Sequence, residues 1–179
     1  MVDETTVIDF GPDIGAACLE YGIDFCNLEN ILITHTHDDH LSFSNLGLLS
    51  MSRKTFDNPI HIYIFPEGYN WCMSKLDAFM PEVDLIPLGD DSARIIVHID
   101  KAYEIHKVFH GKAFKMGKFE VFPFKANHKS YGENEVALNY ILTDEKGKSL
   151  LYACDTGVYS EETLKLIAGA HLDYLIMEC

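Results

Sequence analysis

The sequence predicts a mixed α/β fold in which sheet layers are covered by helices. Three observations lead to this prediction: short apolar runs alternate with longer amphipathic segments, glycine and proline separate many of them, and a strong hairpin turn joins two of the strands. With 179 residues, the chain is expected to form a single domain, residues 1–179, which can bury a core without disulfide or metal staples.

The N-terminal segment is expected to begin with a strand and a helix. Thr5–Phe10 is a β-branched run that Gly11-Pro12 stops, which is typical of a strand. Asp13 is placed to cap a helix that reaches about Tyr21, and Gly22 would end it.

The next strand, Asn30–Thr34, is apolar on both faces and is therefore expected in the interior of a sheet. Leu41–Met51 is predicted to be a helix with Leu41, Leu48 and Leu49 on one face. The later elements are expected to be strands at 59–65, 94–99, 103–109, 118–124, 136–143, 149–153 and 172–177, and helices from Pro66 to about Phe79 and from Ser160. Asp144–Gly147 forms the hairpin turn between two of these strands.

Composition limits the classes of function. The net charge of −14 argues against a nucleic-acid binder that uses a basic face, although a bound cation could still attract a small anionic substrate. Five scattered cysteines without a CxxC pair indicate free thiols in a reducing compartment. Neither a signal peptide nor an apolar run of membrane-spanning length is found, so a cytoplasmic protein without membrane contact is expected.

The segment ILITHTHDDHLS, Ile31–Ser42, carries a cluster of potential metal ligands. Residues i and i+2 of an extended segment face the same way, so His35 and His37 can bind one ion. Asp39 and His40 follow as the chain turns, and they would face a second ion. Imidazoles with carboxylates suit zinc, and also manganese or iron. The alternative is an inert, solvated surface loop.

Two further candidate ligands follow apolar strands elsewhere in the chain. His128 lies in VFPFKANHKS and Asp155 lies in LLYACDTG. Strand ends along one rim of a sheet can direct several side chains at one point, so we expect both residues to join His35 and His37. A structural or solvated role is the alternative for each.

His35-Thr36-His37-Asp38-Asp39-His40 resembles the HxHxDH motif of the metallo-β-lactamase fold superfamily. Asp9 in VIDFGPD, His128 and Asp155 resemble its flanking motifs, in the same order. The resemblance spans Thr5 to Glu178. It implies a four-layer αββα sandwich of mixed sheets, with a two-metal site at one edge.

The same resemblance implies the ligands of two divalent metal ions, with zinc as the first choice. One ion would be held by His35, His37 and His128, and the second by Asp39 and His40, with Asp155 bridging the pair. Asp9 would support the metal loop rather than bind an ion.

The chain departs from the family pattern at both ends. Family members usually carry a β-hairpin or more before the Asp9 motif, and a later strand with a further metal-binding histidine. This chain stops at DYLIMEC. We therefore expect a fold truncated at both ends, with the final histidine and the general acid beyond the C-terminus.

The spacing between His128 and Asp155 helps to choose among the members of the superfamily. Only 26 residues separate His128 from Asp155, too few for the tRNA-gripping arm of ribonuclease Z proteins. IDFGPDI and HLSFSNLGLLS instead resemble the cyclic-phosphate phosphodiesterases related to ribonuclease Z. This implies a hydrolase that uses metal-activated hydroxide, oriented by Asp39, to cleave a small phosphodiester or cyclic phosphate.

Other possibilities stay open. The same metals would serve a thioester, lactone or carboxylic-ester hydrolase, and a truncated, non-catalytic metal-binding domain is a further alternative. A homo-oligomer is also possible. Lys129 and Tyr131 could reach a substrate, although loop residues of this kind are commonly just solvated. The remaining histidines are expected to be structural or surface residues: His61, His98, His106, His110 and His171.

Overall fold

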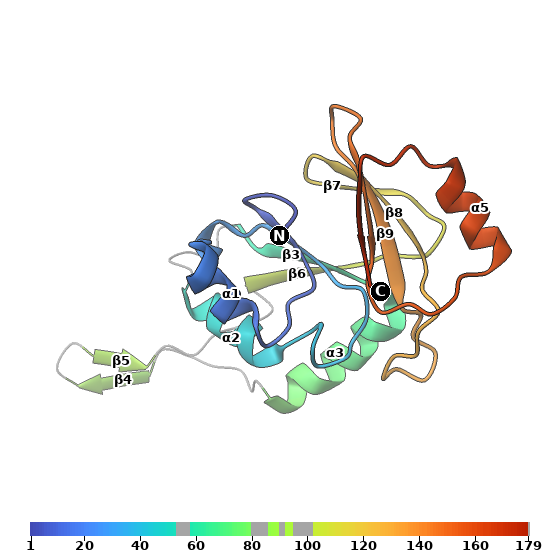
Figure 1. Cartoon of the computed structure of the whole chain (residues 1–179). Coiled ribbons are helices and arrows are strands. Elements are labelled where there is room, and N and C mark those ends of the chain that lie inside the picture. Colours follow the sequence, from blue (N-terminus) through green and yellow to red (C-terminus); the bar gives the residue numbers. More distant parts are fainter. Residues whose placement is uncertain (53–57, 80–85, 90–91, 95–101, 179) are drawn as a thin grey trace.

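The computed structural model describes residues 1–52, 58–79, 86–89, 92–94 and 102–178. Two β-sheets pack face to face, and helices cover their outer faces (Figure 1). This arrangement confirms the expected αββα sandwich. The predicted strand at 94–99 lies almost entirely outside the described residues, as does His98.

The first sheet is parallel, with the strand order β1-β2-β3-β6. Its strands are β1 (Thr6–Ile8), β2 (Asn30–Leu32), β3 (Ile60–Ile64) and β6 (Tyr103–Lys107). Parallel neighbours need crossover connections, which usually contain helices. Here these are α1 (Ile14–Tyr21), a 3₁₀ turn η1 (Phe25–Asn27), α2 (Phe43–Ser52) and α3 (Pro66–Phe79).

The second sheet has the order β11-β10-β9-β8-β7 and is antiparallel except for the parallel pair β10 and β11. Its strands are β7 (Phe114–Met116), β8 (Phe119–Lys125), β9 (Leu138–Thr143), β10 (Ser149–Ala153) and β11 (Tyr174–Met177). Helix α5 (Glu161–Gly169) makes the crossover between the parallel pair. Strands β4 (Ile86–Gly89) and β5 (Ser92–Arg94) form a separate hairpin.

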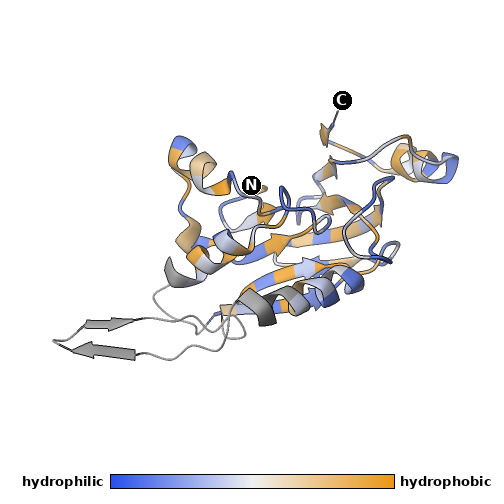
Figure 2. Cartoon of the chain, turned by 90° about the horizontal axis from the view of Figure 1, so that it is seen from below, coloured by the Kyte–Doolittle hydropathy of each residue, from blue (hydrophilic) through white to orange (hydrophobic). Residues whose placement is uncertain are grey.

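Buried apolar residues form one cluster at each layer boundary. The cluster between the sheets contains Leu32 and Tyr63 from the first sheet, and Val121 and Tyr140 from the second. A second cluster joins the outer face of the first sheet to its helices, and a third joins β8–β10 to α5. Each helix carries both hydrophobic and hydrophilic residues, as a helix that covers a sheet should (Figure 2).

Most local predictions are confirmed, with two corrections. The Asp13 side chain makes no capping hydrogen bond, because Asp13 already has helical backbone angles; Gly22 does end α1, with φ of 66°. On α2, Leu46 and Leu49 are buried, whereas Leu48 is 64% exposed and does not belong to the core face. Within the described residues, every helix is too short or too polar to cross a bilayer.

Candidate metal centre

The predicted site residues come from loops at one edge of the two-sheet sandwich. Asp9 follows β1, and His35 to His40 follow β2 at the carboxyl end of the same parallel pair. His128 follows β8 and Asp155 follows β10, so both come from the second sheet. The site therefore bridges the two sheets.

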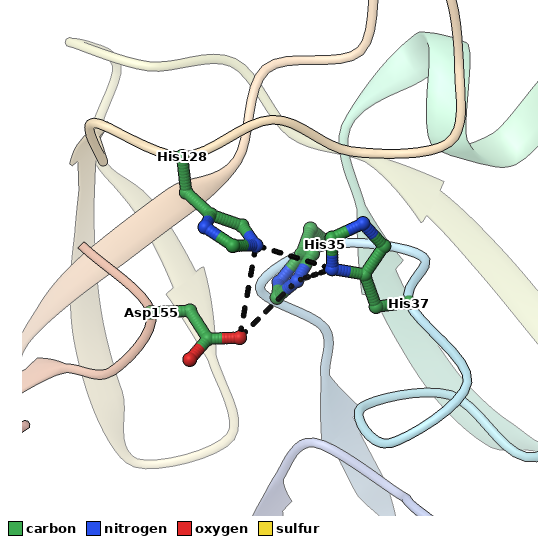
Figure 3. A group of neighbouring side chains, drawn as sticks. All are labelled: His35, His37, His128 and Asp155. Atoms are coloured by element: carbon green, nitrogen blue, oxygen red, sulfur yellow. Dashed lines mark hydrogen bonds and ion pairs between the residues drawn. The ribbon is translucent and has the colours of Figure 1, made fainter. Parts of the chain in front are cut away.

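Three imidazoles and one carboxylate converge (Figure 3). The Nδ1 atom of His37 lies 2.9 Å from Nε2 of His35 and 3.1 Å from Nε2 of His128. The Oδ2 atom of Asp155 lies 3.5 Å from His35 Nε2 and 3.8 Å from His128 Nε2. The expected convergence of His128 with His35 and His37 is thus present in the structure.

A second group lies beside the first and shares one atom with it. His40 Nε2 is 2.8 Å from Asp155 Oδ2 and 3.6 Å from Asp39 Oδ2. Asp155 Oδ2 is consequently within 4 Å of His35, His40 and His128. A carboxylate oxygen in this place can reach two cations, which is the geometry expected of a bridging ligand.

The separations between donor atoms fit bound cations. Zinc bonds of about 2.0–2.1 Å at tetrahedral angles place donor atoms roughly 3.3 Å apart. The four separations in the first group, 2.9 to 3.8 Å, lie around this value. Imidazole and carboxylate donors are also the chemistry that zinc, manganese and iron accept.

Asp9 holds the loop that carries His35 to His40 in place, as the family resemblance implied. Its buried carboxylate accepts hydrogen bonds from the Thr34 amide at 2.8 Å and from the Thr34 hydroxyl at 3.0 Å. Its Oδ2 lies 2.7 Å from Nδ1 of His40. This contact directs the other nitrogen of His40, Nε2, toward Asp155.

The surroundings shift the pKa values of His35 and His40 in opposite directions. Burial, followed by the positive charge of the neighbouring imidazoles, lowers the pKa of His35 to about 3, so this ring is neutral at neutral pH. Burial also opposes protonation of His40, but its hydrogen bond to Asp9 and the nearby carboxylates outweigh burial and raise the pKa of His40 to about 9. Burial raises the pKa of Asp9, against the hydrogen bonds from His40 and Thr34.

The backbone at the site is constrained. Asp9 and Asp155 both adopt left-handed backbone angles, with φ of 60° and 47°. Such conformations are uncommon outside glycine and concentrate at functional sites, and aspartate tolerates them better than most residues. Gly11 packs so closely that a Cβ atom there would lie 1.9 Å from the backbone oxygen of Asp39.

Several supporting residues were not identified from the sequence. The Thr34 hydroxyl contacts Nδ1 of His35 at 3.0 Å as well as Asp9. Thr36 donates a 2.5 Å hydrogen bond to Glu135, which fixes the backbone between the two histidines. The alternation of threonine with histidine in THTH is the signal that could have indicated both threonines. Glu135 gives no local signal.

Tyr131 and Lys129, the two residues considered as substrate contacts, lie in different surroundings. The Tyr131 ring packs against His37 with centroids 4.6 Å apart, so this residue lies at the site. Lys129 is exposed on the same loop. Of the histidines expected to be structural or surface residues, His61 and His106 lie together, with ring nitrogens 3.0 Å apart, and they share no residue with this centre.

Comparison with known proteins agrees with this geometry. Residues 6–179 match the β-lactamase superfamily domain. Three solved structures are similar in fold: a diphosphatase of the PhnP family (22% identity, TM-score 0.66), the metallo-β-lactamase fold protein YhfI from Bacillus subtilis (14%, 0.63) and the short form of human tRNase Z (18%, 0.60). The family match confirms the superfamily that the residues indicated, and the three structures share its fold.

The matches cover nearly all of this chain but only part of its neighbours. The match to the diphosphatase covers 95% of this chain and 54% of the diphosphatase chain. The match to YhfI covers 97% of this chain and 58% of YhfI, and the match to tRNase Z covers 97% of this chain and 66% of tRNase Z. The chain thus spans between about half and two thirds of the length of these structures. No curated protein sequence matches it.

Proposed function

The chain belongs to the β-lactamase superfamily, and we propose that it is a metal-dependent hydrolase that cleaves small phosphodiesters or cyclic phosphates with two divalent cations, zinc being the first choice. The observation that carries this proposal is the place of Asp155 Oδ2, which lies within reach of both groups of metal-binding side chains. The likeness to a diphosphatase and to a tRNase Z is consistent with a phosphate substrate.

In this proposal the first cation is held by His35, His37 and His128, and the second by Asp39 and His40, with Asp155 shared. When bound, the two cations would lower the pKa of water toward neutrality and neutralise charge that develops on the phosphoryl oxygens.

The protein's own groups prepare the ligands. His35 stays neutral because of its low pKa, so its Nε2 lone pair is free to bind at neutral pH. His40 donates its Nδ1 proton to Asp9, which fixes the ring and directs Nε2 toward the second group. Because the pKa of His40 is about 9 without a cation, binding of a cation would release the Nε2 proton. These contacts hold the ligand atoms before a cation arrives, which lowers the cost of ordering them.

Asp39 is the proposed catalytic residue. Its side chain is 73% exposed, whereas the imidazole of His40 beside it is largely buried, so Asp39 lies on the open side where a substrate would arrive. A carboxylate there can accept a hydrogen bond from the attacking water and orient it toward phosphorus.

The test is a side-by-side assay of the zinc-loaded protein against bis(p-nitrophenyl) phosphate, a cyclic nucleotide and a thioester. We expect turnover of the phosphodiesters, no turnover after chelation, and recovery when zinc is restored. Asp39→Asn tests the proposed role and should reduce the rate, with weaker binding of the second cation, because Asp39 is also one of its proposed ligands. Turnover of the thioester alone would move the proposal to carboxyl-ester chemistry. Full metal loading without any turnover would contradict a hydrolase.

A further inference from the structure

A second cluster of metal-binding side chains lies between β3 and the edge strand β6. The two strands are parallel neighbours, and His61 pairs with Glu104 while Tyr63 pairs with His106. Glu104 and His106 are two residues apart on one strand, so both point to the same sheet face as His61. Sequence alone did not indicate this cluster, because 45 residues separate the two histidines and only the strand register brings them together.

The donor atoms of this cluster are spaced as those of a metal site are. His61 Nδ1 lies 3.0 Å from His106 Nε2, and the Glu104 oxygens lie 3.7 Å from each of these nitrogens. The donor separation expected around tetrahedral zinc is roughly 3.3 Å. The corresponding separations at the main centre, 2.9 to 3.8 Å, cover the same range.

The surroundings favour a cation and leave room for it. His61 and His106 are about one third exposed, with side-chain values of 36% and 34%, so water can complete the coordination. The surface depression beside His61 is also lined by Glu4 and Glu29, which add negative charge. Tyr63 stacks on the His106 ring with centroids 4.7 Å apart and fixes its orientation.

A hydrogen bond between the His61 and His106 rings explains less of this geometry than a metal site does. Such a bond needs one protonated and one free nitrogen, but it gives no reason for a carboxylate equidistant from both.

We propose that His61, Glu104 and His106 form an additional binding site for one divalent transition-metal cation, such as zinc, that ties β6 to β3. Two imidazoles and one carboxylate leave a position open for water, and this donor set suits zinc, nickel and copper. The site would stabilise the edge of the first sheet. It is separate from the proposed hydrolytic centre, since it shares no residue with it.

Zinc content after equilibrium dialysis, measured by mass spectrometry, tests the proposal. We expect His61→Gln and His106→Gln each to bind one zinc fewer than the unaltered protein. His171→Gln removes an exposed histidine outside all the clusters and should leave the count unchanged. Equal zinc content in His61→Gln, His106→Gln and the unaltered protein would overturn the proposal.

A second measurement isolates the site. In the double variant His128→Ala/Asp155→Ala, which removes ligands of the main centre, zinc should still raise Tm by mass action. Adding His106→Gln should abolish that rise, and an unchanged rise would refute the assignment. Hydrolysis by His106→Gln with an intact main centre should be normal, so failure of this proposal and failure of the proposed function give different results.

Discussion

Replacing Gly11 by alanine should disable the metal centre through a steric effect alone. A Cβ atom at this position would lie 1.9 Å from the Asp39 oxygen and 2.8 Å from its carbonyl carbon. Real Cβ contacts essentially never fall below 3.0 Å, so the two backbones must separate by about 1 Å. No flexible side chain is available to absorb this movement, because both obstructing atoms belong to the backbone.

The expected magnitude follows from this displacement. Overpacking of this kind costs about 1–3 kcal/mol of stability. A shift of about 1 Å at a catalytic ligand lowers activity about 100-fold. Asp39 and the neighbouring His40 are the residues displaced, so the second cation should be lost first. We therefore expect Gly11→Ala to retain its fold, to lose about one bound ion and to lose most of the proposed phosphodiesterase activity.

The assay combines metal content, urea unfolding and bis(p-nitrophenyl) phosphate turnover. Gly15→Ala is the matched control: it lies four residues away in α1, and a Cβ atom there meets nothing within 4 Å. This control should be neutral or more stable, since alanine favours a helix. Gly11→Ala with metal content and activity equal to Gly15→Ala would refute the reasoning.

Three further predictions concern the site and the strands behind it. Asp155→Ala should abolish activity and release metal with little change in the far-UV circular dichroism spectrum, whereas retained turnover would show that Asp155 does not bridge. The chelated, metal-free protein should be most stable near pH 6.5, by urea titration at pH 5.0, 6.5 and 8.0. Below this pH the unfolded chain protonates His35 while the folded one does not, and above it the folded chain keeps the His40 proton that the unfolded chain loses. The free energy of unfolding should fall by about 1 kcal/mol per pH unit on each side of pH 6.5, and a flat profile would contradict these assignments. Tyr140→Phe removes a buried 2.6 Å hydrogen bond to the Ile33 carbonyl and should cost about 1–3 kcal/mol in urea unfolding; the exposed Tyr174→Phe should cost nothing measurable.

Local patterns in the sequence were sufficient to predict most elements. Gly22, Pro66 and Ser160 mark helix ends through backbone preferences that act within a few residues. Of the three leucines assigned to the buried face of α2, Leu41 and Leu49 are buried and only Leu48 was predicted wrongly. Leu41 lies before the helix begins, so helical spacing counted from it placed Leu48 in the core.

The candidate site could be predicted only where its residues lie close together in a motif or resemble known flanking motifs. His35 to His40 are dense enough to be noticed directly. Glu135 acts on Thr36 across 99 residues, and nothing near it in the sequence suggests that contact. The pairing of His61 with Glu104 likewise depends on strand register, which is a property of the folded sheet.

The joining of two sheets at the centre affects the order in which the protein can mature. His35 and Asp155 are 120 positions apart, so a chain still under synthesis presents the first histidines long before their last partner exists. The nascent segment offers only a weak chelate, and tight capture has to wait until β10 has docked. Cation loading is then a late step that reports completed assembly, and the captured ion acts as a reversible cross-link closing a very long loop.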